Sequence, residues 1–354
     1  NKMESSGKPR VLITGVSGYL GSWICKKALE TGKYIVRGTV RDKNDEKKVA
    51  LLKEAIGEKF DELELFSANL LDKEAITAAV QDCDYVLHTA SPFPPATPKN
   101  FEKELYEPAI NGTKYALEAC VGSKVKRIVI TSSTLTMLEY HNGDGEANDE
   151  VICPETKKHN PYCISKIRAE KFAFDFMEKL DSKDKTFEML TLHPSSIVGP
   201  LLVKRAETAT VKAMLGVMDG TSQGLPLIWV PHSDVRDVAD AHIAALEKGR
   251  DGERYGLYSS TVPMIEFARV LEKEFKPKGY PVKVKQISKC LINFASLFNT
   301  DAKFIKGIWD IHIEFKSDKA VKELGLKMID YETSMIDMGN SFIEHGLVQM
   351  KKKK

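Results

Sequence analysis

The feature that most constrains the fold of this chain is a glycine-rich turn near its start. The apolar segment Val11–Thr14 runs into Gly15-Val16-Ser17-Gly18-Tyr19-Leu20-Gly21, and a helical pattern follows to Thr31. Glycines in such a turn permit positive φ and let the backbone approach a ligand closely. The start of the helix then offers free N–H groups to phosphate oxygens. The turn therefore predicts a dinucleotide site, and it lacks the Gly-Lys-Ser/Thr ending of a nucleotide-hydrolysing loop.

Short apolar runs alternate with helical patterns through the first 190 residues or so. The runs are rich in Val, Ile and Leu without polar alternation, which is typical of strands buried on both faces of a parallel sheet. The alternation predicts an α/β fold with a doubly wound (Rossmann) parallel sheet. The expected strands are Val11–Thr14, Tyr34–Val40, Glu62–Phe66, Tyr85–His88, Arg127–Thr131 and Phe187–His193.

The pattern changes after Pro194, where prolines and glycines interrupt the chain repeatedly. We expect a Rossmann domain that binds the dinucleotide at residues 9–193 and 233–261. A smaller, discontinuous α+β lobe at 194–232 and 262–348 is expected to bind the substrate. The ends, 1–8 and 349–354, are expected to be flexible tails.

Charge and hydropathy exclude several classes of partner. The net charge is +2, and the last four lysines supply +4 of it, so the body lacks the excess cation of a nucleic-acid-binding surface. No apolar run reaches the ~18 residues of a membrane helix, and the polar start carries no signal core. The six cysteines form no C-x-x-C pair, and no histidine pair has metal-binding spacing. We expect a cytoplasmic protein with no metal, no nucleic acid and no membrane as partner.

The residues after the second strand indicate which dinucleotide binds. Arg41 lies twenty residues past Gly21, where dinucleotide folds place the group that contacts the ribose. An acidic residue there accepts the 2′-hydroxyl of NAD, whereas Arg41 and the lysines that follow it suit a 2′-phosphate. Asp42 is the feature that favours NAD. The balance of charge predicts NADP(H).

A candidate catalytic group follows further along the chain. Tyr162 and Lys166 are four residues apart in a helical pattern from Asn160 to Leu180, so they share one helical face. An ammonium one turn away favours the phenolate and lowers the pKa of the phenol. Ser133 follows the strand that ends at Thr131, where a hydroxyl can polarise a carbonyl group. Each feature alone is common, but the three in this order after the glycine turn are unlikely to occur together by chance.

These stretches together resemble the extended short-chain dehydrogenase/reductases, in the branch of dihydroflavonol reductase, cinnamoyl-CoA reductase and the methylglyoxal (aldehyde) reductases. The resemblance covers about residues 10–347. It is carried by LITGVSGYLGS, GTVRD, YVLHTASPF, NGTKYALEAC, KRIVITSS, NPYCISKIRAE, HPSSIVGP, DVRDVADAHIAAL and FKSDKAVKELGL. It implies an NADPH-dependent reductase that transfers a hydride to an aldehyde or ketone. Tyr162 would donate the proton, Lys166 would lower its pKa and bind ribose, and Ser133 would hold the carbonyl.

The resemblance also implies a set of cofactor contacts. These are Gly15, Gly18, Tyr19, Leu20 and Gly21 at the pyrophosphate, Arg41 and Lys48 at the 2′-phosphate, Asn69 and Leu70 at the adenine, Ala90 and Ser91 along the cofactor, and Pro194 and Ile197 beside the nicotinamide. Asn69 replaces the family's usual Asp, and its amide oxygen can still accept a hydrogen bond.

Two departures concern the substrate. Leu138 stands where dihydroflavonol reductases carry an Asn, which argues against a flavonoid. NPYCISK lacks the Trp and second Tyr of the cinnamoyl-CoA reductase signature, so we do not assign the CoA thioester substrate of those enzymes to this chain. Phe93, Leu138 and Met214 are candidate pocket residues, although core packing is an equally simple interpretation of each.

Several alternatives stay open from the sequence. A sugar-nucleotide epimerase or dehydratase could use the same fold, and a non-catalytic NADP(H)-sensing module is a further alternative. Cys153 and Cys163 flank the start of the catalytic helix and could be either a redox-active pair or two buried thiols. The expected partner is a small carbonyl compound, and the sequence allows a monomer or a homodimer.

Overall fold

The computed structural model describes residues 7–91, 98–141, 144–147, 149–156, 159–205, 208–315 and 318–351. The predicted pocket residue Phe93 and most of the two predicted tails lie outside these ranges.

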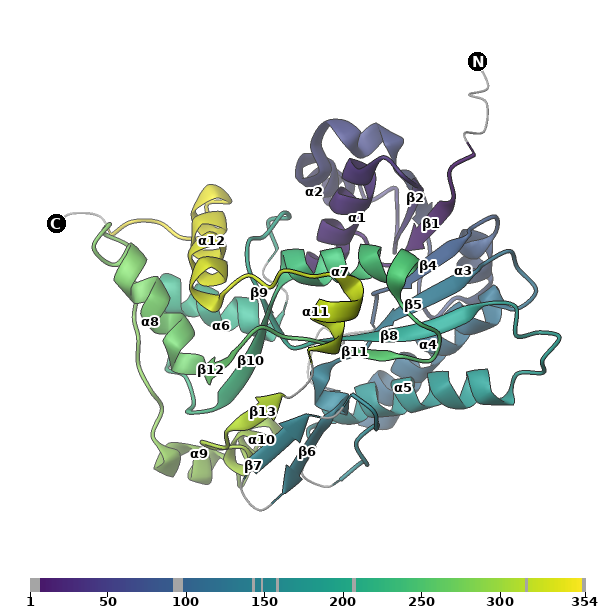
Figure 1. Cartoon of the computed structure of the whole chain (residues 1–354). Helices are drawn as coiled ribbons and strands as arrows, with labels where there is room; N and C mark the ends of the chain where they lie inside the picture. The colour runs from purple at the N-terminus through teal and green to yellow at the C-terminus, as the bar shows by residue number, and fades with distance from the viewer. Residues whose placement is uncertain are drawn as a thin grey trace.

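A parallel sheet of seven strands forms the centre of the molecule (Figure 1). Its strands are β1 (Arg10–Ile13), β2 (Ile35–Val40), β3 (Glu64–Ser67), β4 (Tyr85–His88), β5 (Arg127–Thr131), β8 (Glu188–Pro194) and β11 (Arg254–Leu257). Their order is β3-β2-β1-β4-β5-β8-β11, and every adjacent pair is parallel. The order reverses between β1 and β4, which is the switch point where doubly wound sheets bind ligands. The predicted fold class is confirmed, and β11 is a strand that the sequence reading did not separate out.

Helices cover both faces of this sheet. They are α1 (Tyr19–Thr31), α2 (Glu46–Ile56), α3 (Lys73–Val80), α4 (Glu107–Cys120), α5 (Pro161–Lys179) and α7 (Val235–Lys248). Because side chains alternate along a strand, Val11 and Ile13 pack with α1 and α7 on one face. Leu12 packs with α3, α4 and α5 on the other face. Short helical turns η1 (Gly57–Glu62), η2 (Glu102–Tyr106) and η3 (Thr134–Thr136) complete the connections.

A second hydrophobic core lies beside the sheet (Figure 1). It is enclosed by β9 (Ser196–Val198), β10 (Trp229–Asp234), β12 (Thr261–Pro263), α6 (Ala209–Met218), α8 (Met264–Phe275) and α12 (Tyr331–Glu344). Phe267, Phe275 and Phe342 are fully buried in it. This core contains residues of both segments that we expected to form the second lobe.

The remaining elements connect the two cores. A small sheet holds β6 (Leu138–His141), β7 (Asp144–Ala147) and β13 (Ile313–Phe315), with α9 (Lys289–Ala295) and α10 (Thr300–Gly307) near it (Figure 1). The helix α11 (Lys319–Leu324) belongs by sequence to the segment 262–348, yet its Ala320 and Leu324 pack into the core of the Rossmann sheet. The C-terminal segment therefore crosses back over the first domain before it ends in the second.

The glycines of the β1–α1 connection are required by close backbone contacts. Gly15 has φ +77°, and a Cβ on it would lie 2.9 Å from the Ala90 Cβ. A Cβ on Gly21 would lie 2.2 Å from the Gly15 carbonyl oxygen, and one on Gly18 would lie 3.3 Å from the same atom. A side chain at Gly21 would therefore force the connection apart.

Gly21→Ala should destabilise the protein, because its methyl group has no space beside the Gly15 carbonyl. Overpacking of this kind costs typically ~1–3 kcal/mol. Denaturant titration measures the loss. In the control Gly307→Ala, the added Cβ meets no atom within 4 Å, so stability should hold or rise slightly. Equal effects of the two substitutions would contradict the steric account.

Candidate active site

The glycine turn presents backbone donors at the carboxyl edge of the sheet. The residue before α1, Gly18, has extended backbone and no side-chain cap, so the first N–H groups of the helix are available to an anion. The predicted cradle of glycines thus fits a pyrophosphate. The Tyr19 side chain has another partner, because its hydroxyl donates to the Gly199 carbonyl at 2.7 Å. Trp23 Nε1 donates to the Pro200 carbonyl at 2.8 Å, so the first turns of α1 also fasten the second lobe.

The end of β2 carries the predicted phosphate-binding cations. Arg41 is exposed and has no ion-pair partner among the described residues. The Asp42 carboxylate accepts the Asn44 N–H at 2.8 Å, so the acid that favoured NAD is engaged in its own turn. Lys48 Nζ lies 2.5 Å from the Asp45 carboxylate at the start of α2. Arg41 is therefore the free cation nearest the strand end.

The predicted adenine residues have local roles in the structure. The Asn69 side-chain oxygen accepts the Leu71 N–H at 3.1 Å, and its second lone pair is the acceptor left for the adenine. Leu70 packs against the core beneath α3 and α4. The structure leaves their assignment to the cofactor as a prediction.

The segment after β4 joins the glycine turn to the catalytic helix. Thr14 Oγ1 accepts the N–H groups of Thr89 and Ala90, both at 3.0 Å, which holds this segment against the end of β1. Ala90 and Ser91 line a small cavity together with Lys166. The structure thus brings the predicted cofactor segment and the predicted catalytic lysine to one place.

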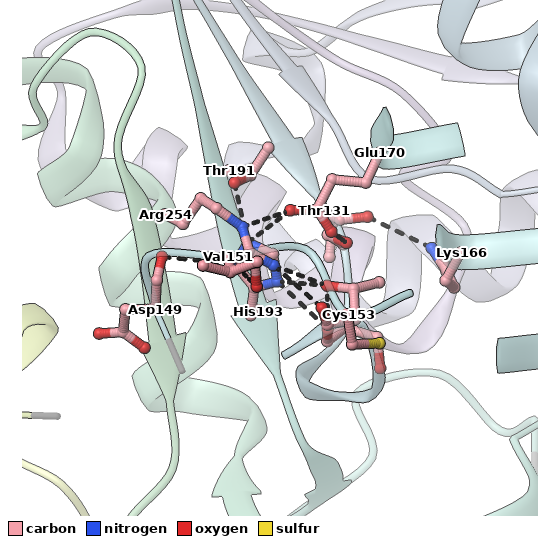
Figure 2. Close-up of polar contacts among 12 residues, drawn as sticks. Thr131, Asp149, Val151, Cys153, Lys166, Glu170, Thr191, His193 and Arg254 are labelled. Atoms are coloured by element: carbon pink, nitrogen blue, oxygen red, sulfur yellow. Dashed lines mark hydrogen bonds and ion pairs between the residues drawn. The ribbon is translucent and has the colours of Figure 1, made fainter. Parts of the chain in front are cut away.

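The helix α5 carries Tyr162 and Lys166 in its first two turns. Asn160 caps it, with its side-chain oxygen accepting the Cys163 N–H at 2.8 Å, and Pro161 occupies the first helical position. Lys166 is buried, and its Nζ donates to the Thr131 carbonyl at 3.3 Å (Figure 2). Tyr162 as a whole is 37% exposed, whereas its hydroxyl group is buried.

The structure gives Tyr162 and Lys166 opposite shifts in pKa. Burial raises the pKa of Tyr162 to about 12, with Cys163 as a smaller cause. Burial lowers the pKa of Lys166 to about 8, partly offset by Glu170. The ammonium points to the Thr131 carbonyl, so desolvation of the phenol dominates. Tyr162 is therefore protonated at neutral pH in this structure.

Ser133 is buried two residues past the end of β5. It precedes η3, and its Oγ accepts the Leu135 N–H at 3.3 Å. Its carbonyl oxygen accepts from Thr136 Oγ1 at 2.9 Å and contacts His193 Nδ1 at 3.1 Å. These contacts fix both the hydroxyl group and the backbone carbonyl of Ser133.

Two residues that the sequence did not single out lie near Thr131 and Lys166 (Figure 2). Glu170 and Arg254 form a buried ion pair, with Arg254 Nε donating to Glu170 Oε1 at 2.7 Å. Ser132 Oγ donates to the other Glu170 oxygen at 2.6 Å. Glu170 follows Lys166 by four residues, so the helical spacing could have identified it. Arg254 lies 84 residues further on and has no local sequence signal.

Of the other predicted residues, two lie on strands near the second lobe, and two are packed in hydrophobic cores. Pro194 ends β8 opposite Leu257, and Ile197 pairs with Ser233 where the second lobe begins. Leu138 is buried in the small sheet, and Met214 is buried in the core of the second lobe. Packing accounts for both of these side chains.

Cys153 and Cys163 are buried, unbridged thiols. Cys153 Sγ donates to the Leu135 carbonyl at 3.4 Å, and burial raises the pKa of Cys163 to about 12. A reactive thiolate is therefore disfavoured at neutral pH. Of the two alternatives for these cysteines, a redox-active pair or two buried thiols, the structure agrees with two buried thiols.

Comparisons with known proteins place the chain in a family. The model of the NAD dependent epimerase/dehydratase family matches residues 11–259. Cinnamoyl-CoA reductase 1 of Arabidopsis thaliana is 34% identical over 343 residues, covering 95% of this chain and 90% of that protein. A cinnamoyl-CoA reductase of Medicago truncatula is 36% identical over 292 residues, covering 79% and 86%. The crystal structure of vestitone reductase from alfalfa (Medicago sativa) superposes with a TM-score of 0.73 at 25% identity, covering 96% of this chain and 100% of that one.

The chain therefore belongs to the NAD dependent epimerase/dehydratase family, the extended short-chain dehydrogenase/reductases. Its curated relatives include cinnamoyl-CoA and dihydroflavonol reductases, which confirms the predicted class of oxidoreductase. The alternative of a sugar-nucleotide epimerase has less support.

The free energy of unfolding should fall as the pH drops from about 6.5 toward 4. Burial lowers the pKa of His88, His193 and His242 to about 4. Between this value and ~6.5 the unfolded chain binds more protons, so each histidine removes up to ~1.4 kcal/mol per pH unit. Denaturant titrations across this range measure the slope. His242→Gln removes one such group and should give a shallower slope, and an unchanged slope would count against a buried neutral His242.

Proposed function

We propose that this chain is an NADPH-dependent carbonyl reductase that converts an aldehyde or ketone to an alcohol. NADPH, when bound, supplies the hydride to the carbonyl carbon. Tyr162 donates its hydroxyl proton to the carbonyl oxygen, and the phenolate is then reprotonated from solvent. Ser133 hydrogen-bonds the same oxygen, and Lys166 provides a fixed positive charge beside the reaction. The observation that carries this proposal is the position of Tyr162 on α5, one helical turn from a lysine whose ammonium reaches the end of β5.

The cofactor assignment is supported by the charges at the end of β2. Arg41 is exposed without a partner among the described residues, and Asp42 is engaged by the Asn44 N–H. A guanidinium matches a phosphate in charge and geometry. We therefore propose that Arg41 contacts the 2′-phosphate of NADPH and that Lys48 gives a weaker, exposed contribution.

The substrate is proposed only as a class. Relatives are named for cinnamoyl-CoA and dihydroflavonol, and Leu138 and the NPYCISK segment argue against a direct transfer of either. We propose a small aldehyde or ketone, and a panel of aldehydes, α-dicarbonyls, aryl ketones, flavonoids and acyl-CoA thioesters would identify it by NADPH consumption.

Location remains a prediction. Among the described residues no helix has the length and apolarity needed to cross a bilayer. The six cysteines are free, and we propose a reducing, cytoplasmic compartment.

Tyr162→Phe should lower kcat by at least ~10²-fold, because the ring keeps its packing but has no proton to donate. NADPH should still bind, as fluorescence titration of the purified variant would show. The control Tyr115→Phe removes a hydroxyl from α4 and should leave kcat unchanged. Full turnover by Tyr162→Phe would defeat the proposed mechanism.

Arg41→Ala should weaken NADPH binding roughly 10- to 100-fold, since a hydrogen bond to a charged group contributes ~1.5–3 kcal/mol. Binding of NADH, which has no 2′-phosphate, should change little. Parallel titrations with the two cofactors measure the difference. Lys53→Ala, in the last turn of α2, serves as the control for loss of one positive charge. An equal loss for NADPH and NADH would refute the assignment of Arg41 to the 2′-phosphate.

A further inference from the structure

A buried ion pair lies behind the active site and takes no direct part in the proposed chemistry. The side chains of Glu170 and Arg254 are 1% and 5% exposed. Figure 2 shows them facing each other between α5 and β11. Two charges removed from water are costly to keep unless each is fully hydrogen-bonded, so the partners of this pair indicate what it holds in place.

The Arg254 guanidinium contacts three separate segments. Its Nε donates to Glu170 on α5 at 2.7 Å. Its Nη1 donates to the carbonyl oxygens of Val151, at 2.6 Å, and Asp149, at 3.3 Å. Its Nη2 donates to the carbonyl and to the hydroxyl of Thr136, both at 3.2 Å. One side chain therefore joins the catalytic helix, the turn after Ser133 and the segment before Cys153.

The Glu170 carboxylate fastens the same helix to the sheet. Its second oxygen accepts from Ser132 Oγ at 2.6 Å, and the Ser132 N–H donates to the Leu192 carbonyl at 2.8 Å. Lys166 donates to the Thr131 carbonyl one residue earlier. Thus α5 is attached to the end of β5 at two consecutive residues, immediately before Ser133.

Spacing along the helix places Glu170 in line with the catalytic groups. Tyr162, Lys166 and Glu170 are separated by four residues each, so all three lie on one face of α5. The ion pair of Glu170 and Arg254 is therefore connected to Tyr162 and Lys166 through the helix. It is connected to Ser133 through the flanking residues Ser132 and Thr136.

We propose that Glu170 and Arg254 are positioning residues that set the Ser133 hydroxyl in register with Tyr162 and Lys166. This inference rests on the proposed carbonyl reduction. A displacement of ~1 Å at a reacting group can cost ~10²-fold in rate, so loss of the pair should slow turnover. The cofactor turn at Gly15 to Gly21 lies on other elements and should keep its affinity.

Glu170 has a second, electrostatic effect on Lys166. Several groups surround that ammonium: His88 on β4 and His193 on β8, which burial keeps neutral at pH 7, together with Tyr162 on its own helix. Arg254 on β11 is cationic. Glu170 is the anion that raises the pKa of Lys166 against burial. Removal of its charge should therefore move the alkaline limb of the rate profile to lower pH.

The central test is Glu170→Gln, with kcat, KM and the pH profile measured for NADPH-dependent reduction of the best carbonyl compound in the panel. We expect kcat to fall roughly 10- to 100-fold, with the dissociation constant of NADPH unchanged and the alkaline limb displaced to lower pH. The control Glu178→Gln makes the same change at an exposed position of α5 and should match wild type. A variant with wild-type kcat and pH profile would overturn the positioning role.

A milder variant covers the case in which Glu170→Gln fails to fold. Ser132→Ala removes one hydrogen bond and leaves the ion pair intact. It should lower kcat by a smaller factor at a near-native melting temperature, and it should leave the alkaline limb in place because the charge stays. Wild-type kcat in this variant would overturn the role of the Glu170 bond.

The two proposals fail in different ways. Absence of carbonyl reduction by the wild-type protein would remove the proposed function and with it this inference. A fully active wild type, an inactive Tyr162→Phe and an unaffected Glu170→Gln would overturn the positioning role alone.

Discussion

The structure depends first on the contact between Gly21 and the carbonyl oxygen of Gly15. Only a residue without a side chain allows α1 to begin so close to the end of β1, since a Cβ on Gly21 would lie 2.2 Å from that oxygen. This contact places the start of α1 at the switch point between β1 and β4. Tyr19 and Trp23 can then reach Gly199 and Pro200 and hold the second lobe at the same edge.

Burial has opposite effects on the two titratable groups of the site. It disfavours the phenolate of Tyr162 and raises its pKa to about 12, and it disfavours the ammonium of Lys166 and lowers its pKa to about 8. Tyr162 therefore keeps the proton that a reduction requires. The carboxylate of Glu170 favours the charged lysine.

The sequence predicted the elements whose signals are local. The strands Tyr85–His88 and Arg127–Thr131 were predicted with their observed bounds, because short runs of apolar residues between helices leave little choice. The need for glycine at position 21 was also predicted, because the turn between the strand and the helix must be tight. By contrast, Arg254 on β11 contacts residues that are distant in sequence, so no local pattern indicates its role.

The site was predicted less completely than the fold. The sequence predicted Ser133, Tyr162 and Lys166 by order and spacing. The family resemblance assigned Ala90 and Ser91 to the cofactor, and the structure places both in one cavity with Lys166. The resemblance also placed Tyr19 in the pyrophosphate cradle, and it did not indicate that the Tyr19 hydroxyl donates to the Gly199 carbonyl. The sequence predicted that Lys166 lowers the pKa of Tyr162; the burial that raises this pKa is a property of the folded environment, and no spacing reveals it.

The central claim is that this chain moves a hydride from NADPH to a carbonyl carbon. The most direct measurement is the mass spectrum of the alcohol formed by the wild-type protein from an aldehyde and NADPH that carries deuterium at the transferred position. The account predicts one deuterium on the carbinol carbon of the product. An alcohol without deuterium, or no alcohol with any carbonyl compound, would contradict it.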